Sequence, residues 1–210
     1  MRGIYAHDNF ITSVSVFPLG NIISVSDDKS IKIWDINFNL LQNIKNAHDK
    51  GINYVDIKDE NNFVTCSEDK NIKTWIKKEN KFELNQIIKD EHKNAINKVI
   101  YTFNGNIISC SDNNNIKIWD LSTPKYKLIM EKTIHSESIK SILLLEDKEI
   151  LISGGNDGTK FWNLNNLNYL FGFNNVCCGV WNAIERIDEN RIIIGGVKYL
   201  NVISLKKKKL

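Results

Sequence analysis

The sequence predicts an all-β fold made of repeated four-stranded sheets, and three observations support this prediction. Intervals of 41, 44 and 43 residues separate four histidines, His7, His48, His92 and His135. The same three intervals separate four tryptophans, Trp34, Trp75, Trp119 and Trp162. Between each His and its Trp, short apolar runs alternate with turn-forming clusters, which is typical of β-strands joined by tight turns. A fixed period of this length indicates a repeat fold in which each unit is one small sheet.

Each unit is expected to supply four strands, as the first unit illustrates. Its strand-like segments are FITSVSVF, NIISVS, SIKIWDI and LLQNIK, at residues 10–17, 21–26, 30–36 and 40–45. The first and third alternate apolar and polar residues, and clusters such as PLGN and DDK form turns between the strands. A lone four-stranded sheet leaves two half-apolar faces, so several sheets must pack face to face around an axis. This arrangement is a β-propeller.

One continuous domain is expected over residues 1–210, because only two prolines and no Gly/Ser-rich linker interrupt the chain. The fifth unit is degenerate and keeps only the strand pattern, in WNAIERI, RIIIGGV and YLNVISL. The repeats run approximately over 7–47, 48–91, 92–134, 135–176 and 177–205, followed by a basic tail at 206–210.

The composition argues against several classes of function. The apolar stretches are far shorter than the roughly 20 residues that cross a bilayer, and the amino terminus lacks a signal-peptide pattern. We therefore expect no membrane association and a cytoplasmic or nuclear rather than secreted protein. The four cysteines lack zinc-type pairs and are expected to be reduced thiols without a metal. A net charge of +3 is too small to indicate nucleic-acid binding, and the Lys206–Lys209 run is expected to be solvated.

The recurring residues include the types of a hydrolase triad, for example His7, Ser24 and Asp28. Catalysis needs one pre-organised set of residues beside a cleft, whereas this set recurs in unit after unit. The repetition favours a structural role, and we expect no enzymatic activity, no cofactor and no small-molecule substrate.

The stretch from His7 through ISVSDDKSIKIWD resembles the WD repeat, whose Trp-Asp pair ends the third strand of each propeller blade. The resemblance covers nearly the whole chain and implies a propeller of about five four-stranded blades. A closed five-bladed ring, with Arg2 to Tyr5 pairing outside YLNVISL, is favoured over an open arc and over a truncated piece of a longer propeller.

The resemblance also implies a structural tetrad in each blade, in which a Ser or Thr and an Asp hydrogen-bond the His, and the His meets the Trp. The third unit has Asn113 in place of Asp. In the fourth, Asp157 lies five rather than six residues before Trp162, so either Gly158 absorbs the offset or Asp157 leaves the network. The expected tetrads are His7, Ser24, Asp28 and Trp34; His48, Thr65, Asp69 and Trp75; His92, Ser109, Asn113 and Trp119; and His135, Ser153, Asp157 and Trp162.

WD-repeat propellers chiefly serve as rigid platforms for protein partners, and the resemblance places two sets of less uniform residues around the channel mouth. Three acidic members predict attraction of a Lys/Arg-bearing peptide; the alternative is that they are ordinary solvated turn residues. Trp181 is either a core residue or a surface aromatic anchor. The hypothetical partner-binding residues are Thr12, Asn53, Asn97, Lys140 and Asn182; Asp27, Glu68, Asp112 and Asn156; and Trp181.

The predicted function is therefore a noncatalytic scaffold or adaptor that presents a propeller face to protein or peptide partners. The alternative is a substrate-recognition subunit of a ubiquitin ligase or another multiprotein complex, which no F-box-like helix supports. An RNA-associated protein ranks lower, because only the lysine tail favours it.

Overall fold

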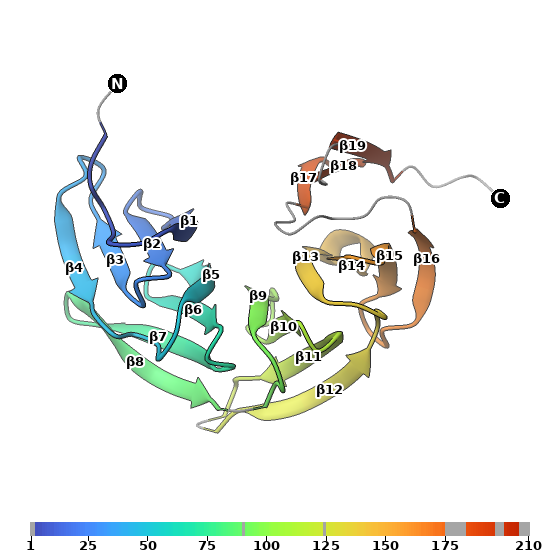
Figure 1. The fold of residues 1–210 in the computed structure, drawn as a ribbon, viewed down its shortest axis with the longest axis horizontal. Helices are drawn as coiled ribbons and strands as arrows, with labels where there is room; N and C mark the ends of the chain where they lie inside the picture. Colours follow the sequence, from blue (N-terminus) through green and yellow to red (C-terminus); the bar gives the residue numbers. More distant parts are fainter. Residues whose placement is uncertain (1–2, 90, 124, 175–183, 196–199, 206–210) are drawn as a thin grey trace. The chain divides into compact units, whose positions relative to one another are not determined.

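Short antiparallel strands make up nearly all of the regular structure (Figure 1). The structure, a computed structural model, describes residues 3–89, 91–123, 125–174, 184–195 and 200–205. Within these ranges, no helix has the length and apolarity of a membrane span. The chain divides into two compact units, Met1–Ser109 with Lys117–Met130 and Cys110–Ile116 with Glu131–Leu210. The expected single domain over 1–210 stays a prediction.

The first two sheets lie in the first unit, and each is a meander of four strands in chain order (Figure 1). In each of these sheets, the second strand is the most buried, which explains its uninterrupted run of small and apolar residues. The strands are β1 (Ile11–Val16), β2 (Ile22–Ser26), β3 (Ile31–Trp34), β4 (Leu40–Ile44), β5 (Ile52–Asp59), β6 (Asn62–Ser67), β7 (Ile72–Lys78) and β8 (Lys81–Ile88).

An apolar cluster joins these two sheets. Phe17 and Ile33 come from the first sheet and its turn, and Phe63 and Phe82 come from the second. The Phe17 and Phe82 rings stack with centroids 5.2 Å apart, and Phe63 meets Phe82 edge-on at 5.0 Å. Each fully buried side chain of this size contributes about 1.5–3 kcal/mol of transfer free energy, so packing between neighbouring sheets stabilises the fold.

Three further sheets follow along the chain, again as antiparallel meanders. A 3₁₀ turn, η1 (Glu146–Lys148), links the first two strands of the fourth sheet. The strands are β9 (Ile96–Tyr101), β10 (Ile107–Ser111), β11 (Asn115–Asp120) and β12 (Lys127–Thr133); β13 (Ile139–Leu145), β14 (Ile150–Gly155), β15 (Gly158–Asn163) and β16 (Tyr169–Phe173); and β17 (Ile184–Asp188), β18 (Arg191–Gly195) and β19 (Leu200–Ser204).

The expected all-β fold with one sheet per repeat is confirmed, including the fifth sheet, for which the sequence predicts three strands of its own. Over the described residues, that sheet has three strands, β17, β18 and β19. Gly3–Tyr5, expected to supply the fourth strand together with Arg2, adopt no strand conformation, and Arg2 lies outside the described residues. The closed ring stays a prediction.

Candidate functional site

The structure brings the four expected residues of the first repeat together at one buried corner of the first sheet. His7 Nε2 lies 2.7 Å from Ser24 Oγ, and His7 Nδ1 lies 2.9 Å from an Asp28 carboxylate oxygen. Trp34 donates its indole N–H to the same Ser24 oxygen over 3.0 Å. Since an ionised carboxylate only accepts, His7 donates from Nδ1, and Ser24 donates its hydroxyl proton to Nε2. One directed chain of hydrogen bonds therefore runs from Trp34 to Asp28.

The second, third and fourth sheets repeat this geometry. In each sheet, a buried Ser or Thr oxygen accepts the Trp N–H and contacts His Nε2, while an Asp contacts His Nδ1 in the second and fourth sheets. The described hydrogen bonds of the third repeat join His92 and Trp119 to Ser109. The His-to-hydroxyl distances are 2.8 Å for His48 and Thr65, 2.8 Å for His92 and Ser109, and 2.6 Å for His135 and Ser153.

Burial and hydrogen bonding shift the pKa values of these groups. Burial alone raises the pKa of the Asp69 carboxyl, but hydrogen bonds from His48 and from two backbone N–H groups outweigh it and hold the pKa well below its usual range. For Asp28 and Asp157, hydrogen bonds likewise outweigh burial and lower the carboxyl pKa. Burial lowers the pKa of His48 and His135 despite their acidic partners. The His48 and His135 imidazoles are therefore neutral at pH 7, and the Asp28, Asp69 and Asp157 carboxylates are ionised.

The fourth sheet accommodates its altered spacing at two places. The turn η1 takes up the extra residue between the first two strands. The turn between the second and third strands of a sheet, called the b–c turn here, is one residue shorter in the fourth sheet than in the first. Gly158 has φ of +120°, and a Cβ there would lie 2.5 Å from the Phe173 carbonyl oxygen. Only glycine fits this position without strain. With the offset absorbed at Gly158, Asp157 keeps its contact with His135.

A lysine two residues before each tetrad Trp belongs to the same corner and was missed by the sequence reasoning. Its ammonium donates to the backbone carbonyl of the residue directly before the tetrad His, which ties the third strand to the incoming chain. The signal was present, because these lysines repeat the 41, 44 and 43 intervals of the His and Trp sets. The pairs are Lys32 with Ala6, Lys73 with Ala47, Lys117 with Glu91, and Lys160 with Ile134.

The residues expected at the channel mouth divide into two groups. Thr12 donates its hydroxyl to the carbonyl of Ile52 on the neighbouring second sheet, and Asn53 donates to the carbonyl of Ile96 over 2.9 Å. Both side chains therefore tie neighbouring sheets together. Asn97 lies at the equivalent position of β9 and is half-buried. Trp181 and Asn182 lie outside the described residues.

The acidic members of the second group lie in the b–c turns. Asp27 is half-buried and Glu68 is exposed. Both meet Gly51, since a Cβ on Gly51 would lie 2.7 Å from the Asp27 carboxylate and Glu68 donates its backbone N–H to the Gly51 carbonyl. A Cβ at position 51 would therefore displace the Asp27 carboxylate.

The two remaining b–c turn residues differ from Asp27 and Glu68. The Asp112 carboxylate is half-exposed and pairs with Lys140 at 2.5 Å. Asn156 is exposed and donates its backbone N–H to Ser138. The exposed negative charge therefore concentrates on the turns of the first two sheets, because the third carboxylate is neutralised locally.

The described residues contain no cluster of three or more His, Cys, Asp or Glu side chains that is arranged to hold a metal ion. Cys66 and Cys110 lie in the second strands of their sheets and are buried. They occupy crowded inner positions where a small side chain fits.

Repeated four-stranded sheets that each carry the same buried His, hydroxyl and Trp set define a repeat protein of the β-propeller class. Three segments, residues 1–35, 39–75 and 84–120, match the family model described as WD domain, G-beta repeat. Together they span just over half of the chain, which therefore belongs to this family, and the predicted WD-repeat membership is confirmed. The fourth sheet builds the same corner beyond the matched segments. Among curated proteins, no significant match is found.

Proposed function

We propose that the chain is a noncatalytic scaffold or adaptor that presents a propeller face to protein or peptide partners. Propellers of this family commonly serve as platforms for protein interactions. We also propose a cytoplasmic or nuclear location, which the sparse cysteines of the sequence support.

The state of the tetrad hydroxyls supports the noncatalytic part of the proposal. A serine nucleophile must offer an oxygen lone pair to a substrate beside a cleft. Ser24 is only 4% exposed, and its oxygen already accepts the Trp34 N–H while its proton engages His7. Ser109 and Ser153 are fully buried in the same arrangement. The residues that resemble a hydrolase triad are therefore held as framework.

The b–c turns of the first two sheets are the surface to which we assign partner binding. Asp27 and Glu68 lie beside Gly51, and neither takes part in a salt bridge within the described residues. Two neighbouring carboxylates attract a Lys- or Arg-bearing segment and speed its association. Lys29 and Lys70 flank them, so a partner must match a mixed pattern of charge.

Affinity purification from the native cell tests this assignment. We expect the Asp27→Lys/Glu68→Lys variant to lose partners that the wild-type chain recovers. Asp112 is left unchanged, because its replacement would break the pair with Lys140. Glu79→Lys/Glu185→Lys is the matched control, since it makes the same change of charge at two exposed carboxylates outside these turns, neither of which forms a salt bridge within the described residues. Equal recovery of the same partners by wild type and the Asp27→Lys/Glu68→Lys variant would refute the assignment.

A further inference from the structure

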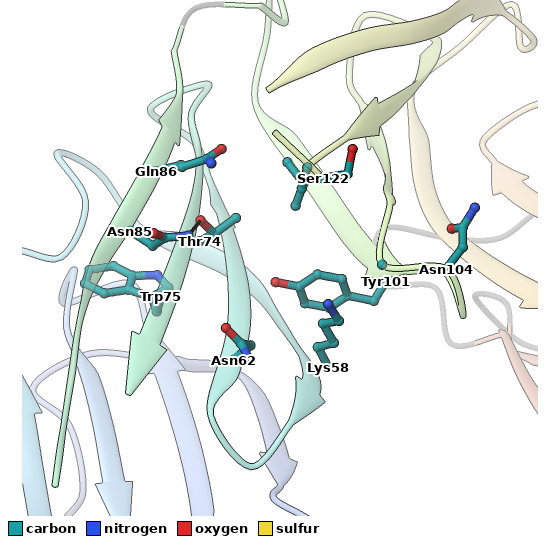
Figure 2. Close-up of a pocket in the computed structure, with 11 residues that line it drawn as sticks. Lys58, Asn62, Thr74, Trp75, Asn85, Gln86, Tyr101, Asn104 and Ser122 are labelled. Atoms are coloured by element: carbon teal, nitrogen blue, oxygen red, sulfur yellow. Dashed lines mark hydrogen bonds between the residues drawn. The ribbon is translucent and has the colours of Figure 1, made fainter. Parts of the chain in front are cut away.

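A cleft of about 300 Å³ lies between the second and third sheets, within the first compact unit. Figure 2 shows the Tyr101 ring reaching from the third sheet toward the second, beside the Lys58 side chain. Amide and hydroxyl groups make up most of the remaining wall, with Trp75 and Leu121 as its apolar part. The polar lining consists of Lys58, Asn62, Thr74, Asn85, Gln86, Tyr101, Asn104 and Ser122.

The equivalent place between the first and second sheets is filled. Lys58 follows its tetrad His by ten residues, as Phe17 does in the first repeat, and Thr74 precedes its tetrad Trp, as Ile33 does. Phe17 and Ile33 are 2% and 3% exposed and belong to the apolar cluster that joins those sheets. The second repeat thus has a cation and a hydroxyl where the first has buried apolar side chains.

The second compact unit shows the same contrast. Leu145 and Phe161 occupy these two positions in the fourth repeat, and both are fully buried in the cluster that packs against the fifth sheet. Apolar packing is therefore the ordinary solution at this place between sheets. A polar cleft lacks the stabilisation that apolar packing gives at this place. The polar residues Lys58 and Thr74 therefore indicate a functional site that binds a ligand.

The first repeat also shows what such a place can hold. The Gln42 side-chain amide donates to the Phe82 carbonyl over 2.8 Å and accepts the Phe82 N–H over 2.9 Å, so it pairs with both backbone groups of one residue in the next sheet. Gln86 is the equivalent residue of the second sheet, where it lines the cleft and donates to the Thr123 carbonyl over 3.3 Å. Asn85 and Asn104 add side-chain amides. Asn85 donates to Thr74 over 3.4 Å and the Asn104 oxygen accepts from Thr102 and Asn106, so a peptide backbone would pair with the Asn85 oxygen and the Asn104 N–H groups.

Charge adds a preference for one kind of peptide side chain. Lys58 is the sole charged side chain in the described lining, and it is exposed. Two carboxylates that flank Lys58 in the sequence are engaged elsewhere: Asp56 accepts the Tyr101 backbone N–H over 2.7 Å, and Asp59 accepts from Asn61 and Asn62. The cation thus faces the cleft without an acidic partner in its lining.

We propose that this cleft binds a short extended peptide segment of a partner protein, with its backbone held by the amides and an Asp or Glu side chain paired with Lys58. This inference rests on the proposed scaffold function and adds a second binding place, of opposite charge preference, to the b–c turns of the first two sheets.

Selection from a random hexapeptide library on the full chain tests the proposal. We expect the wild-type chain to enrich peptides with an Asp or Glu at one position. Lys58→Glu should lower affinity for the selected peptide about tenfold and shift the enrichment to Lys or Arg, because the charge at the contact is inverted. Lys81→Glu, an equal change of charge at an exposed position of β8, should leave the enrichment unchanged.

A second variant separates binding from folding. Thr74→Ile restores the residue of the first repeat and fills the cleft, so it should abolish peptide binding while its thermal midpoint equals or exceeds that of wild type. No enrichment by wild type, or equal binding by wild type and Thr74→Ile, would overturn the cleft assignment. Neither result bears on the proposed scaffold function, which is tested separately by partner recovery with the Asp27→Lys/Glu68→Lys variant.

Discussion

The hydroxyl of each tetrad links its His and its Trp, because it donates one hydrogen bond and accepts another. Thr65 donates to His48 and accepts from Trp75 in a fully buried corner, so its single oxygen satisfies two other side chains. A buried polar group that loses its partner costs about 1–3 kcal/mol. This hydroxyl thus stabilises the sheet by pairing with two buried side chains, His48 and Trp75, that would otherwise lack a partner.

Replacing this hydroxyl gives the first prediction. Thr65→Val keeps the shape of the side chain but leaves His48 Nε2 and Trp75 Nε1 unpaired, so the free energy of unfolding should fall by about 2–4 kcal/mol. Urea denaturation measures it. Thr133→Val, on an exposed position of β12, is the control and should change stability by less than about 0.5 kcal/mol. Equal stability of Thr65→Val and wild type would contradict the assigned hydrogen-bond chain.

The shifted pKa values predict how stability depends on pH. The folded pKa of His48 and His135 lies below the usual 6.5, so the unfolded chain binds protons first as the pH falls. Stability is therefore full above about pH 6.5 and declines below it. The Asp28, Asp69 and Asp157 pKa values are lowered from 3.8, so their contribution is lost only below about pH 4.

NMR titration of the imidazole C–H signals measures the histidine part directly. We expect His48 and His135 to titrate below pH 6.5, and the free energy of unfolding to fall between pH 7 and pH 5. His48→Asn should make the free energy of unfolding depend less steeply on pH in this range. A His48 midpoint at or above 6.5 would show that its acidic partner outweighs burial.

At the scale of elements, the b–c turns differ between sheets in their backbone conformation. The residue after the tetrad Asp or Asn is left-handed in the first three sheets, at Lys29, Lys70 and Asn114, with φ of 67° to 69°. Side chains other than glycine pay a steric cost in this conformation. Gly158 holds the equivalent place in the fourth sheet, at φ of +120°.

Opposite substitutions at these turns should have opposite effects. Lys70→Gly should stabilise the chain by up to about 1 kcal/mol, because it relieves the left-handed backbone. Gly158→Ala should destabilise it by about 1–3 kcal/mol, because the new Cβ meets the Phe173 carbonyl. Thermal unfolding monitored by circular dichroism compares the two. Changes of the same sign would mean that the turns do not differ as described.

The lysine before each tetrad Trp gives an element-scale prediction of its own. Lys73→Met keeps the aliphatic stem but removes the ammonium that donates to the Ala47 carbonyl over 2.7 Å. The free energy of unfolding should fall by about 1–2 kcal/mol, and amide exchange near Ala47 should quicken. Lys81→Met, at an exposed position, serves as the control. If both variants matched wild type, the lysine contact would contribute nothing to the fold.

Sequence reasoning located the elements well because it depended on intervals that folding preserves. The spacing of His7 and Trp34, repeated three times, predicts where the first three strands of four sheets lie. It predicts partner binding at Thr12 and Asn53, which stays a prediction, but not that both side chains donate to a backbone carbonyl of the next sheet. No interval carries that information, because the acceptor belongs to another repeat and comes near only in the folded chain.

At the scale of the whole molecule, the contacts between neighbouring sheets differ from one repeat to the next. Contacts between sheets are apolar at Phe17 and at Leu145 but polar at Lys58, although the three residues share one position in the repeat. The substitution is visible in the sequence. Its consequence, a cleft that also involves Tyr101 of the next sheet, depends on how the second and third sheets pack, which spacing does not predict.

We propose that the repeated residues form a framework, while the less uniform residues between them bind partners. The most direct test is the amount of partner protein recovered per folded molecule by Thr65→Val, whose tetrad is broken but whose surface is unchanged. We expect a yield equal to that of wild type at a temperature where the variant is folded. A loss of partners from the folded variant would show that the tetrad acts in function rather than as framework.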